Sequence, residues 1–209
     1  MAHPASNPWK NFLAGLDKVS QVTLVGPLFN KQHRAVTPTV YVDGGVRFRD
    51  YDTRNRVPTV SVGDGDSSDI PLDHMLPVEK DYSDLAFVLR SLPAHVRHLE
   101  LYGFLGGRRD HELINFGEAH HFLNGAPTLK SVRFDDLVIA FCGGPLDIDL
   151  QGAFSVVLFE QAVITIKGAC KYPLDRPTTM PTASSLGLSN SGFGKVYFDC
   201  LKPCFIFLD

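Results

Sequence analysis

Acidic residues follow two apolar runs of the sequence, at the points where each run gives way to glycine. Asp43 begins Asp-Gly-Gly after the first run, and Asp64 and Asp66 lie in Gly-Asp-Gly-Asp-Ser after the second. In an open parallel sheet, ligands bind outside the carboxyl ends of the strands, so we expect the three carboxylates to share one rim. Carboxylates this close repel one another unless a cation lies among them. Oxygen ligands without histidine or cysteine favour Mg²⁺, whose coordination substrate phosphates usually complete.

A third acidic motif, Lys80-Asp81-Tyr82-Ser83-Asp84, precedes a run with apolar residues at helical spacing. We expect Asp81 at the helix N-cap and Asp84 in the first turn, where acids are stabilising. Helix capping here, and turn formation at the other acids, explain each motif without any function. These explanations do not account for Lys80 or for three acidic motifs in one chain.

The fourth motif runs from residue 101 to residue 111 and contains Gly106-Gly107-Arg108 between an apolar run and a helical pattern. Glycines let the backbone approach a ligand, helix N-terminal N–H groups point at anions, and an arginine binds phosphate oxygens in a bidentate fork. The motif therefore predicts a phosphate-binding loop. The sequence contains no G-x-x-x-x-G-K-[ST], which excludes a P-loop NTPase.

The elements that must position these motifs alternate in type along the first part of the chain. Short β-branched runs alternate with helical patterns, which indicates an α/β domain with a largely parallel sheet and helices on its faces. The expected strands are 22–25, 39–42, 59–62 and 98–102, and the expected helices are 84–91 and 112–123. A surface helix is also expected within residues 1–21, where apolar side chains recur at roughly helical spacing.

The pattern changes at residues 124–127, so we place one domain at 1–126 and a second at 127–209. The second domain shows short apolar runs separated by turn residues, at 131–134, 137–141, 154–159, 163–167, 195–198 and 204–208. Such spacing is typical of an all-β antiparallel sandwich. Residues 172–194 are rich in Pro, Thr, Ser and Gly and contain no periodic run, so we expect a long loop there.

Composition and charge exclude several classes of protein. The net charge is -3 and no run of Lys or Arg exceeds two residues, so the basic footprint of a nucleic-acid-binding protein is missing. No apolar stretch reaches about 20 residues, and the first 21 residues lack a signal-peptide pattern, so we expect a cytoplasmic protein that does not bind membranes. Cys142, Cys170, Cys200 and Cys204 lie in apolar runs without zinc-site spacing, which indicates buried, reduced thiols.

Taken in order, the four motifs resemble those of the thiamine pyrophosphokinase family. That family has D-G-G, G-D-x-D-S, K-D-x-T-D and G-G-R-x-D-H in this order, and each has a counterpart between residues 43 and 111. In the second domain, residues 168–174 and 187–190 are similar to the family's G-L-K-Y-P-L and G-x-S-N segments. The resemblance covers about residues 39–209, and six ordered motifs make it specific.

The resemblance implies a reaction and a set of roles. Members of the family transfer a pyrophosphoryl group from ATP to the hydroxyl of thiamine with Mg²⁺, giving thiamine diphosphate and AMP. It implies that Asp64, Asp66 and Asp84 hold Mg²⁺ and act in catalysis together with Arg108. The other implied contacts to the substrates are Asp43, Gly44, Gly106, Gly107, Asp110 and His111 on the side of ATP. Those implied for thiamine are Lys80 and Asp81 at its pyrimidine, and Ser189, Asn190 and Phe193 on the neighbouring subunit. Because the family's vitamin site lies across a dimer interface, the resemblance also implies a homodimer.

Two departures from the family pattern keep other functions open. Only 14 residues separate Asp66 from Asp81, where the family has an extra helix, and the segment 26–38 is also short. A shortened nucleotide domain is compatible with transfer to another heterocyclic alcohol, such as a pterin. It is equally compatible with a sensor that binds thiamine without catalysis.

Overall fold

The computed structural model describes residues 7–51 and 56–209, and the chain divides into two compact units, Met1–Glu118 and Ala119–Asp209. The first unit contains the parallel strand pairs, whereas the second contains antiparallel pairs. The predicted succession of a parallel α/β part and an all-β part is therefore confirmed. The domain boundary at 126/127 stays a prediction, since the compact units divide at residues 118 and 119.

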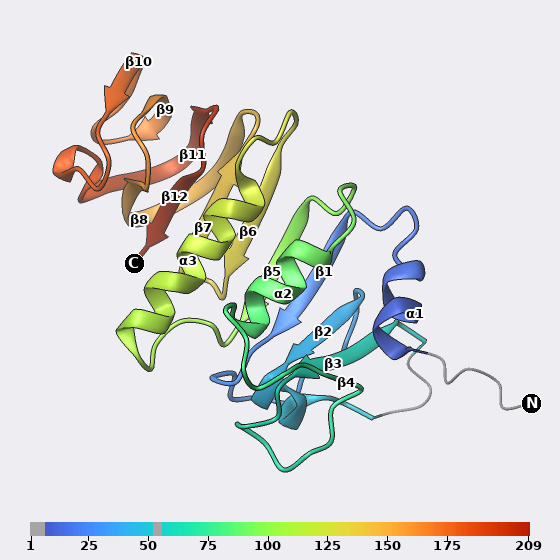
Figure 1. Cartoon of the computed structure of the whole chain (residues 1–209). Helices are drawn as coiled ribbons and strands as arrows, with labels where there is room; N and C mark the ends of the chain where they lie inside the picture. The colour runs from blue at the N-terminus through green and yellow to red at the C-terminus, as the bar shows by residue number, and fades with distance from the viewer. Residues whose placement is uncertain (1–6, 52–55) are drawn as a thin grey trace, which may run out of the picture. The chain divides into compact units, whose positions relative to one another are not determined.

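The first unit is built on a parallel sheet in the order β5-β1-β2-β3-β4 (Figure 1). Its strands are β1 (Gln21–Val25), β2 (Thr39–Val42), β3 (Thr59–Gly63), β4 (His74–Met75) and β5 (His98–Tyr102). The three strands β1, β2 and β3 are buried along almost their whole length. Strands covered on both faces have continuous apolar sequences, which is why the sequence predicted them. Strand β4 was not predicted because a strand of two residues is too short to show an alternating pattern of apolar and polar side chains.

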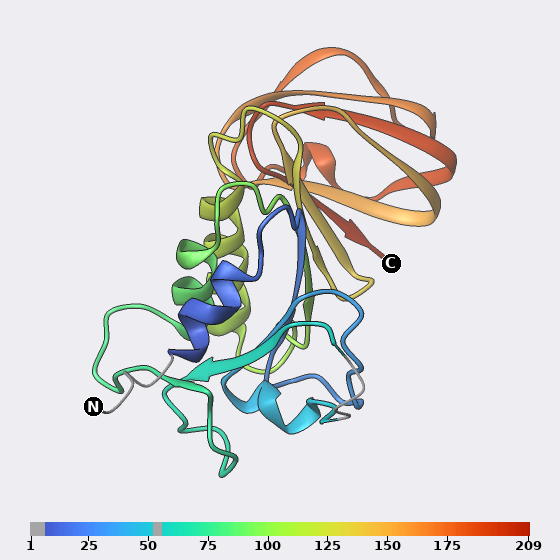
Figure 2. The same ribbon diagram turned by 90° about the vertical axis from the view of Figure 1, so that its right-hand side faces the viewer.

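Helices α1 (Pro8–Ala14) and α2 (Asp84–Ser91) lie on the same face of this sheet (Figures 1 and 2). Helix α1 begins after Asn7, whose side chain accepts a hydrogen bond from the backbone N–H of Lys10, and it buries Trp9 and Phe12. The predicted N-terminal helix is confirmed for the described residues, and residues 1–6 lie outside them. Helix α3 (Arg109–Leu123) begins three residues before its predicted start. Among the described residues, no helix has the length and apolar character needed to cross a membrane.

The second unit is an antiparallel sheet in the order β10-β9-β11-β8-β12-β7-β6. Its strands are β6 (Lys130–Phe134), β7 (Val138–Cys142), β8 (Leu146–Leu158), β9 (Ala162–Cys170), β10 (Leu174–Met180), β11 (Asn190–Cys200) and β12 (Cys204–Leu208). One cluster of buried side chains, drawn mainly from β8, β9 and β11, forms its core.

Strand β8 must bend strongly along its length. Its first residue, Leu146, pairs with Phe198 of β11, and its last, Leu158, pairs with Cys204 of β12. A straight strand of this length would hold its ends about 40 Å apart, yet the chain from Phe198 to Cys204 reaches at most about 20 Å. The sheet therefore folds over its core, as the curved strands in Figure 2 show. One folded sheet covers the core, and a division into two sandwich layers stays a prediction.

The prediction of a long loop at residues 172–194 is wrong. The segment contains β10, the short 3-10 helix η2 (Ser185–Gly187) and the start of β11. Strand β10 was hidden because it is an edge strand that contains Pro177 and shifts register against β9. The start of β11 was hidden by Gly192 and Gly194, which interrupt the apolar alternation.

Candidate active site

Three carboxylates converge at the carboxyl ends of β2 and β3. One oxygen from each of Asp43, Asp64 and Asp84 lies within 4.8 Å of the others. Asp43 is only 8% exposed, and its Oδ1 atom is buried without a hydrogen-bond partner in the described part of the chain. Burying an unpaired carboxylate oxygen is costly unless a cation compensates it. The arrangement therefore has the donor set and the uncompensated charge of a site for a hard cation such as Mg²⁺.

Glycine at position 63 allows Asp43 and Asp64 to approach each other. A Cβ atom at Gly63 would lie 2.8 Å from the Cα atom of Asp43, so any other residue would force the two strand ends apart. Asp43 itself has φ 48°, a left-handed conformation that aspartate tolerates better than most residues. This conformation starts the 3-10 helix η1 (Asp43–Phe48) and turns the chain sharply at the end of β2. Such strain is concentrated at functional sites.

Lys80 is the counter-ion of the acid cluster. Its Nζ atom lies 2.5 Å from Oδ2 of Asp64 and 3.1 Å from Oδ1 of Asp84, and all three side chains are less than 15% exposed. Burial lowers the pKa of Lys80, but the hydrogen bond to Asp64 and the ion pair with Asp84 outweigh burial and leave this pKa above its ordinary value. Lys80 therefore stays charged at neutral pH. Its ammonium group neutralises the same carboxylates that a bound metal cation would neutralise.

The two acids that contact Lys80 have opposite pKa shifts. For Asp64, burial raises the pKa, but hydrogen bonds from Lys80 and from the backbone N–H of Asp66 together lower it below the ordinary value. For Asp84, burial is the largest effect and raises the pKa; the charges of Asp64 and Asp43 add to it, and Lys80 opposes it only in part. Asp84 is thus the member of the cluster that takes up a proton more readily than an ordinary aspartate.

The start of α2 corrects the predicted helix cap. Ser83, not Asp81, is the N-cap, because its Oγ atom accepts a hydrogen bond from the backbone N–H of Ala86 at 3.1 Å. Asp84 is consequently the first helical residue, and its prediction in the first turn is confirmed. Asp81 is exposed. Its predicted contact to a ligand stays a prediction.

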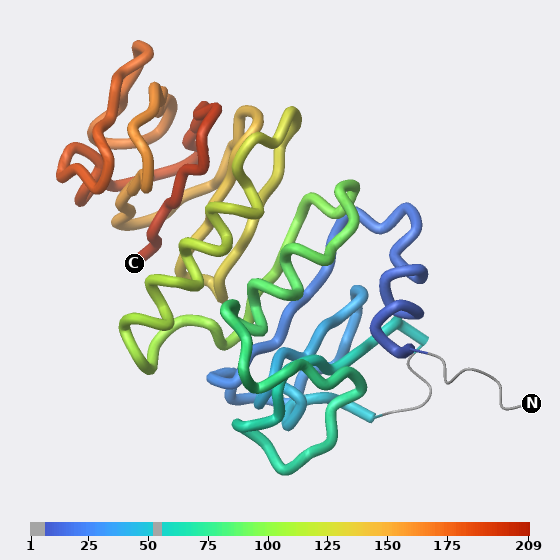
Figure 3. Tube along the Cα trace, viewed as in Figure 1, coloured from blue at the N-terminus to red at the C-terminus, as the bar shows by residue number. Residues whose placement is uncertain are grey.

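Asp66 lies outside the group of three converging acids. Its Oδ1 atom accepts a hydrogen bond from the Ser67 hydroxyl at 2.9 Å, and its backbone N–H donates to Asp64 at 3.4 Å. These contacts are those of a local turn, as the alternative interpretation of this motif expected. Asp66 still lines the same cleft as the cluster, so its role as a metal ligand remains untested. The segment that follows runs without a helix from β3 past β4 to α2 (Figure 3).

The phosphate-binding loop predicted between β5 and α3 contains two consecutive left-handed glycines, Gly106 and Gly107. A Cβ atom at Gly106 would meet no other atom within 4 Å, so a ligand has room to approach on that side, but the backbone N–H of Gly106 donates to Oε2 of Glu112 at 2.6 Å. Arg108 makes a bidentate ion pair with Asp110, with distances of 2.5 and 3.2 Å, and both side chains are more than 60% exposed. The hydrogen bond from Arg108 lowers the pKa of Asp110 to about 2. The guanidinium is thus held at the helix start but remains accessible.

A cleft of about 600 Å³ in the first unit joins the acid cluster to this loop. Besides Asp43, Asp64, Asp84 and Lys80, it is lined by Gly106, Gly107, Arg108 and His111. Of the residues predicted to contact ATP, Gly44 and Asp110 do not line it. The motifs did not predict the apolar and amide lining of the cleft, which consists of Leu28, Tyr82, Phe104 and Asn115.

Asn115 could have been found from its spacing, because it lies one helical turn after His111 and so shares its face of α3. Its side-chain amide donates to the carbonyl of Phe104 at 2.8 Å, which fixes the loop before the glycines. The cleft therefore combines acids, an exposed arginine side chain, a glycine loop and a partly apolar wall. That combination can accommodate a polyphosphate together with a planar ring.

The vitamin residues predicted in the second unit, Ser189, Asn190 and Phe193, lie on or next to β11. Asn190 is buried, and its side chain binds the backbone of Tyr172 in both directions, at 2.9 Å to the N–H and 2.8 Å to the carbonyl. Ser189 has φ 57° and donates its backbone N–H to Ser155. Phe193 is 63% exposed. The structure thus shows Asn190 in a positioning role and leaves Phe193 available for contact.

Comparisons with known proteins show the fold. No protein-family model and no curated protein matches the sequence. The thiamine pyrophosphokinase from Bacillus subtilis superimposes with a TM-score of 0.63 at 21% identity, over 90% of this chain and 99% of that one. The enzyme of the same name from Geobacillus thermodenitrificans gives 0.64 at 21% identity, over 90% and 97%. The one from Candida albicans gives 0.63 at 14% identity, over 100% and 95%. The chain therefore has the fold of solved thiamine pyrophosphokinases.

Proposed function

We propose that this chain is a thiamine pyrophosphokinase, which transfers a pyrophosphoryl group from ATP to the hydroxyl of thiamine. The observation that carries the proposal is the cluster of Asp43, Asp64 and Asp84 in a cleft that also contains the glycine-arginine loop. The fold supports it, because structures of this name share the architecture over nearly the whole chain. The ordered motifs support it independently of the fold.

The acid cluster fits Mg²⁺. Its donors are hard oxygen atoms only, and the buried Oδ1 atom of Asp43 has no other partner among the described residues. We assign Asp43, Asp64 and Asp84 as the residues that would hold the ion. Asp66, on the rim of the same cleft, could join them by rotating away from Ser67. When bound, Mg²⁺ would neutralise phosphate charge and fix the orientation of the polyphosphate.

The remaining cleft residues position ATP and move charge. The Arg108 guanidinium and the N–H of Gly107 would hold the phosphates, and the N–H of Gly106 would join them by exchanging its bond to Glu112 for a phosphate oxygen. Lys80 would turn from the acids to a phosphate oxygen. In the reaction the hydroxyl oxygen of thiamine bonds to the β-phosphorus, the bond from that phosphorus to the α–β bridging oxygen breaks, and AMP leaves. The carboxylate oxygen of Asp84 that does not hold the ion is the proposed acceptor of the hydroxyl proton. Such a transfer needs positioning and charge neutralisation more than covalent catalysis.

The vitamin would bind on the second unit of a neighbouring copy, in a homodimer. The exposed ring of Phe193, with Tyr172 held by Asn190, offers flat apolar surface for a heterocycle. Ser189 and Asn190 would then set the backbone on which these rings lie. Chemical crosslinking and sedimentation should give a dimer, and Phe193→Ala should raise the KM for thiamine more than the KM for ATP.

Incubation with Mg-ATP and thiamine tests the proposal. The expected products are AMP and thiamine diphosphate in equal amounts, formed about 10²–10³-fold more slowly by Asp64→Asn. AMP formation with a pterin alcohol but not with thiamine would identify another acceptor. Tight thiamine binding without any AMP would identify a sensor, and either outcome would overturn the proposal.

A further inference from the structure

A carboxylate of the chain itself binds the glycine loop of the cleft. The backbone N–H of Gly106 donates to Oε2 of Glu112 at 2.6 Å. Glu112 lies in the first turn of α3, and its own N–H donates to the carbonyl of Arg108 at 3.1 Å, which fixes its backbone next to the loop. Carboxylate and phosphate oxygens accept the same charge-assisted hydrogen bonds. The loop therefore already holds an anionic group where a phosphate donor is needed.

The two anion donors of the loop differ in how easily they change partner. Arg108 pairs with Asp110, but both side chains are more than 60% exposed, so solvent weakens this pair. The N–H of Gly106 is part of the backbone and can change partner only if the loop turns. Gly106 lines the cleft and Glu112 does not, so their bond draws this N–H away from the space that a phosphate would occupy. Glycine, here with φ 85° and open space beside it, permits such a turn.

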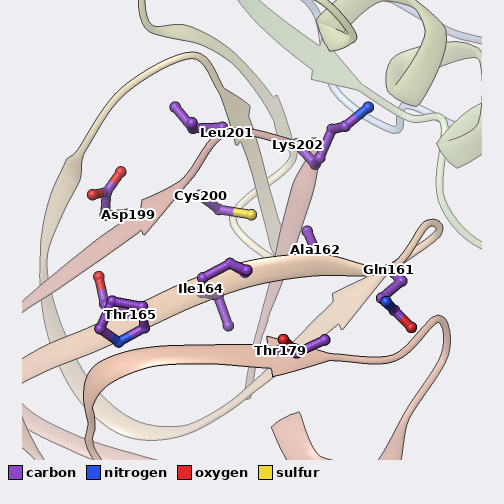
Figure 4. A pocket seen from close by; sticks show the side chains of 11 residues that line it. Gln161, Ala162, Ile164, Thr165, Thr179, Asp199, Cys200, Leu201 and Lys202 are labelled. Atoms are coloured by element: carbon purple, nitrogen blue, oxygen red, sulfur yellow. The ribbon is translucent and has the colours of Figure 1, made fainter.

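The pocket of the second unit is a poor place for a phosphate. It has about 470 Å³, lies between β9, β10 and the end of β11, and has a mostly apolar wall (Figure 4). Lys202 is the one cation among the described residues that line it, and its ammonium group pairs with Oε2 of Glu160 at 3.0 Å. Asp199 adds a negative charge to the same wall. We therefore expect a polyphosphate to bind in the cleft of the first unit.

We propose that Glu112 is a built-in competitor of phosphate that sets the affinity of the loop for polyphosphates, a role that rests on the proposed function because the loop must receive the phosphates of ATP. In the closed loop Glu112 holds the N–H of Gly106, and in the open loop a phosphate oxygen takes its place. A ligand that needs the less populated arrangement binds more weakly, in proportion to the fraction of molecules that adopt it. One charge-assisted hydrogen bond shifts such an equilibrium by about tenfold or more.

Calorimetric titration with inorganic pyrophosphate, at a constant concentration of Mg²⁺, tests the proposal. Glu112→Gln keeps the shape of the side chain and a neutral acceptor for the N–H of Gly106, but removes the charge. It should bind pyrophosphate about ten times more tightly than the wild type. Glu118→Gln is the matched control, because it removes the same charge from the same helix at a residue that pairs with Arg90. It should bind pyrophosphate as the wild type does.

The direction of the change separates competition from a purely structural role. If Glu112 only braces the loop, Glu112→Gln will bind pyrophosphate as weakly as the wild type or more weakly, and the proposal is overturned. A second measurement uses the wild type and so does not depend on the folding of a variant. The NMR amide resonance of Gly106 should move as pyrophosphate is added, and a resonance that stays in place while calorimetry shows binding would also overturn the proposal.

Failure of this proposal can be told apart from failure of the proposed function. Binding of pyrophosphate that is equal in wild type and Glu112→Gln would overturn the competition by Glu112 and leave the transfer reaction untouched. Binding by none of the three proteins would overturn both the competition and the phosphate site. Tighter binding by Glu112→Gln alone would support the competition even if thiamine were not the acceptor.

Discussion

Replacing Lys80 by methionine should destabilise the metal-free protein and at the same time strengthen its response to Mg²⁺. Lys80 compensates Asp64 and Asp84 at 2.5 and 3.1 Å in a largely buried setting. Methionine retains most of the side-chain volume but leaves three neighbouring carboxylates without a cation. Removing one partner of a buried ion pair costs about 3–5 kcal/mol. A chain of this size loses about 2–4 °C in Tm per kcal/mol, so the expected fall is roughly 6–20 °C.

Mg²⁺ should reverse most of this loss, because in the variant it no longer has to displace the ammonium group. A ligand at 100 times its Kd stabilises a protein by about 2.7 kcal/mol. The assay is thermal unfolding with and without Mg²⁺, followed by calorimetric titration of Mg²⁺ without nucleotide. The variant should bind Mg²⁺ more tightly than the wild type.

Lys195→Met is the matched control. Lys195 pairs with Asp147 at 3.2 Å, but both side chains are more than half exposed, so Tm and the Mg²⁺ response should hardly change. Lys80→Arg retains the charge and should keep most of the stability. The reasoning is refuted if Lys80→Met unfolds at the wild-type temperature, or if Mg²⁺ stabilises the variant and the wild type equally.

Three further predictions concern the same site. Asp64→Asn should lower kcat by about 10²–10³-fold with a smaller loss of stability than Lys80→Met. An unchanged rate would mean that Asp64 only stabilises a turn. Because burial raises the pKa of Asp84, this carboxylate takes up its proton at a higher pH than an ordinary aspartate, and Mg²⁺ affinity should fall from that higher pH downward. In titrations of Asp84→Asn over the same pH range, Mg²⁺ affinity should depend less on pH. Gly63→Ala should lower Tm and weaken Mg²⁺ binding, because the new Cβ atom would lie 2.8 Å from the Cα atom of Asp43. Gly117→Ala is the control: its Cβ atom would meet nothing within 4 Å, so neither Tm nor Mg²⁺ binding should fall. Equal effects of the two variants would contradict this packing argument.

The first unit could be predicted from the sequence because its strands are buried on both faces. Strands β1, β2 and β3 are continuous apolar runs, and the acids that follow them meet at one edge for topological reasons. The second unit was predicted less well. The edge position and Pro177 hid β10. The first half of β8 was missed although its apolar residues alternate with acids, the pattern of a half-buried strand.

Which acids converge could not be read from the sequence. Asp43 belongs to the cluster because Gly63 permits close contact between two strand ends, a packing fact that residue types do not encode. Asp66 points elsewhere because the Ser67 hydroxyl captures its carboxylate in a turn. Lys80 was expected to contact the vitamin, but the structure places its ammonium group on the acids. The contact of Lys80 with the vitamin stays a prediction.

The most direct test of the central claim follows the β-phosphoryl group of ATP. The protein is incubated with Mg²⁺, thiamine and ATP that carries a label in the β-phosphate, and the products are separated. We predict that the label appears in thiamine diphosphate in the same amount as AMP is formed. Label that stays in ADP, or that is released as inorganic pyrophosphate while thiamine remains unmodified, would contradict the assignment of this cleft to pyrophosphoryl transfer.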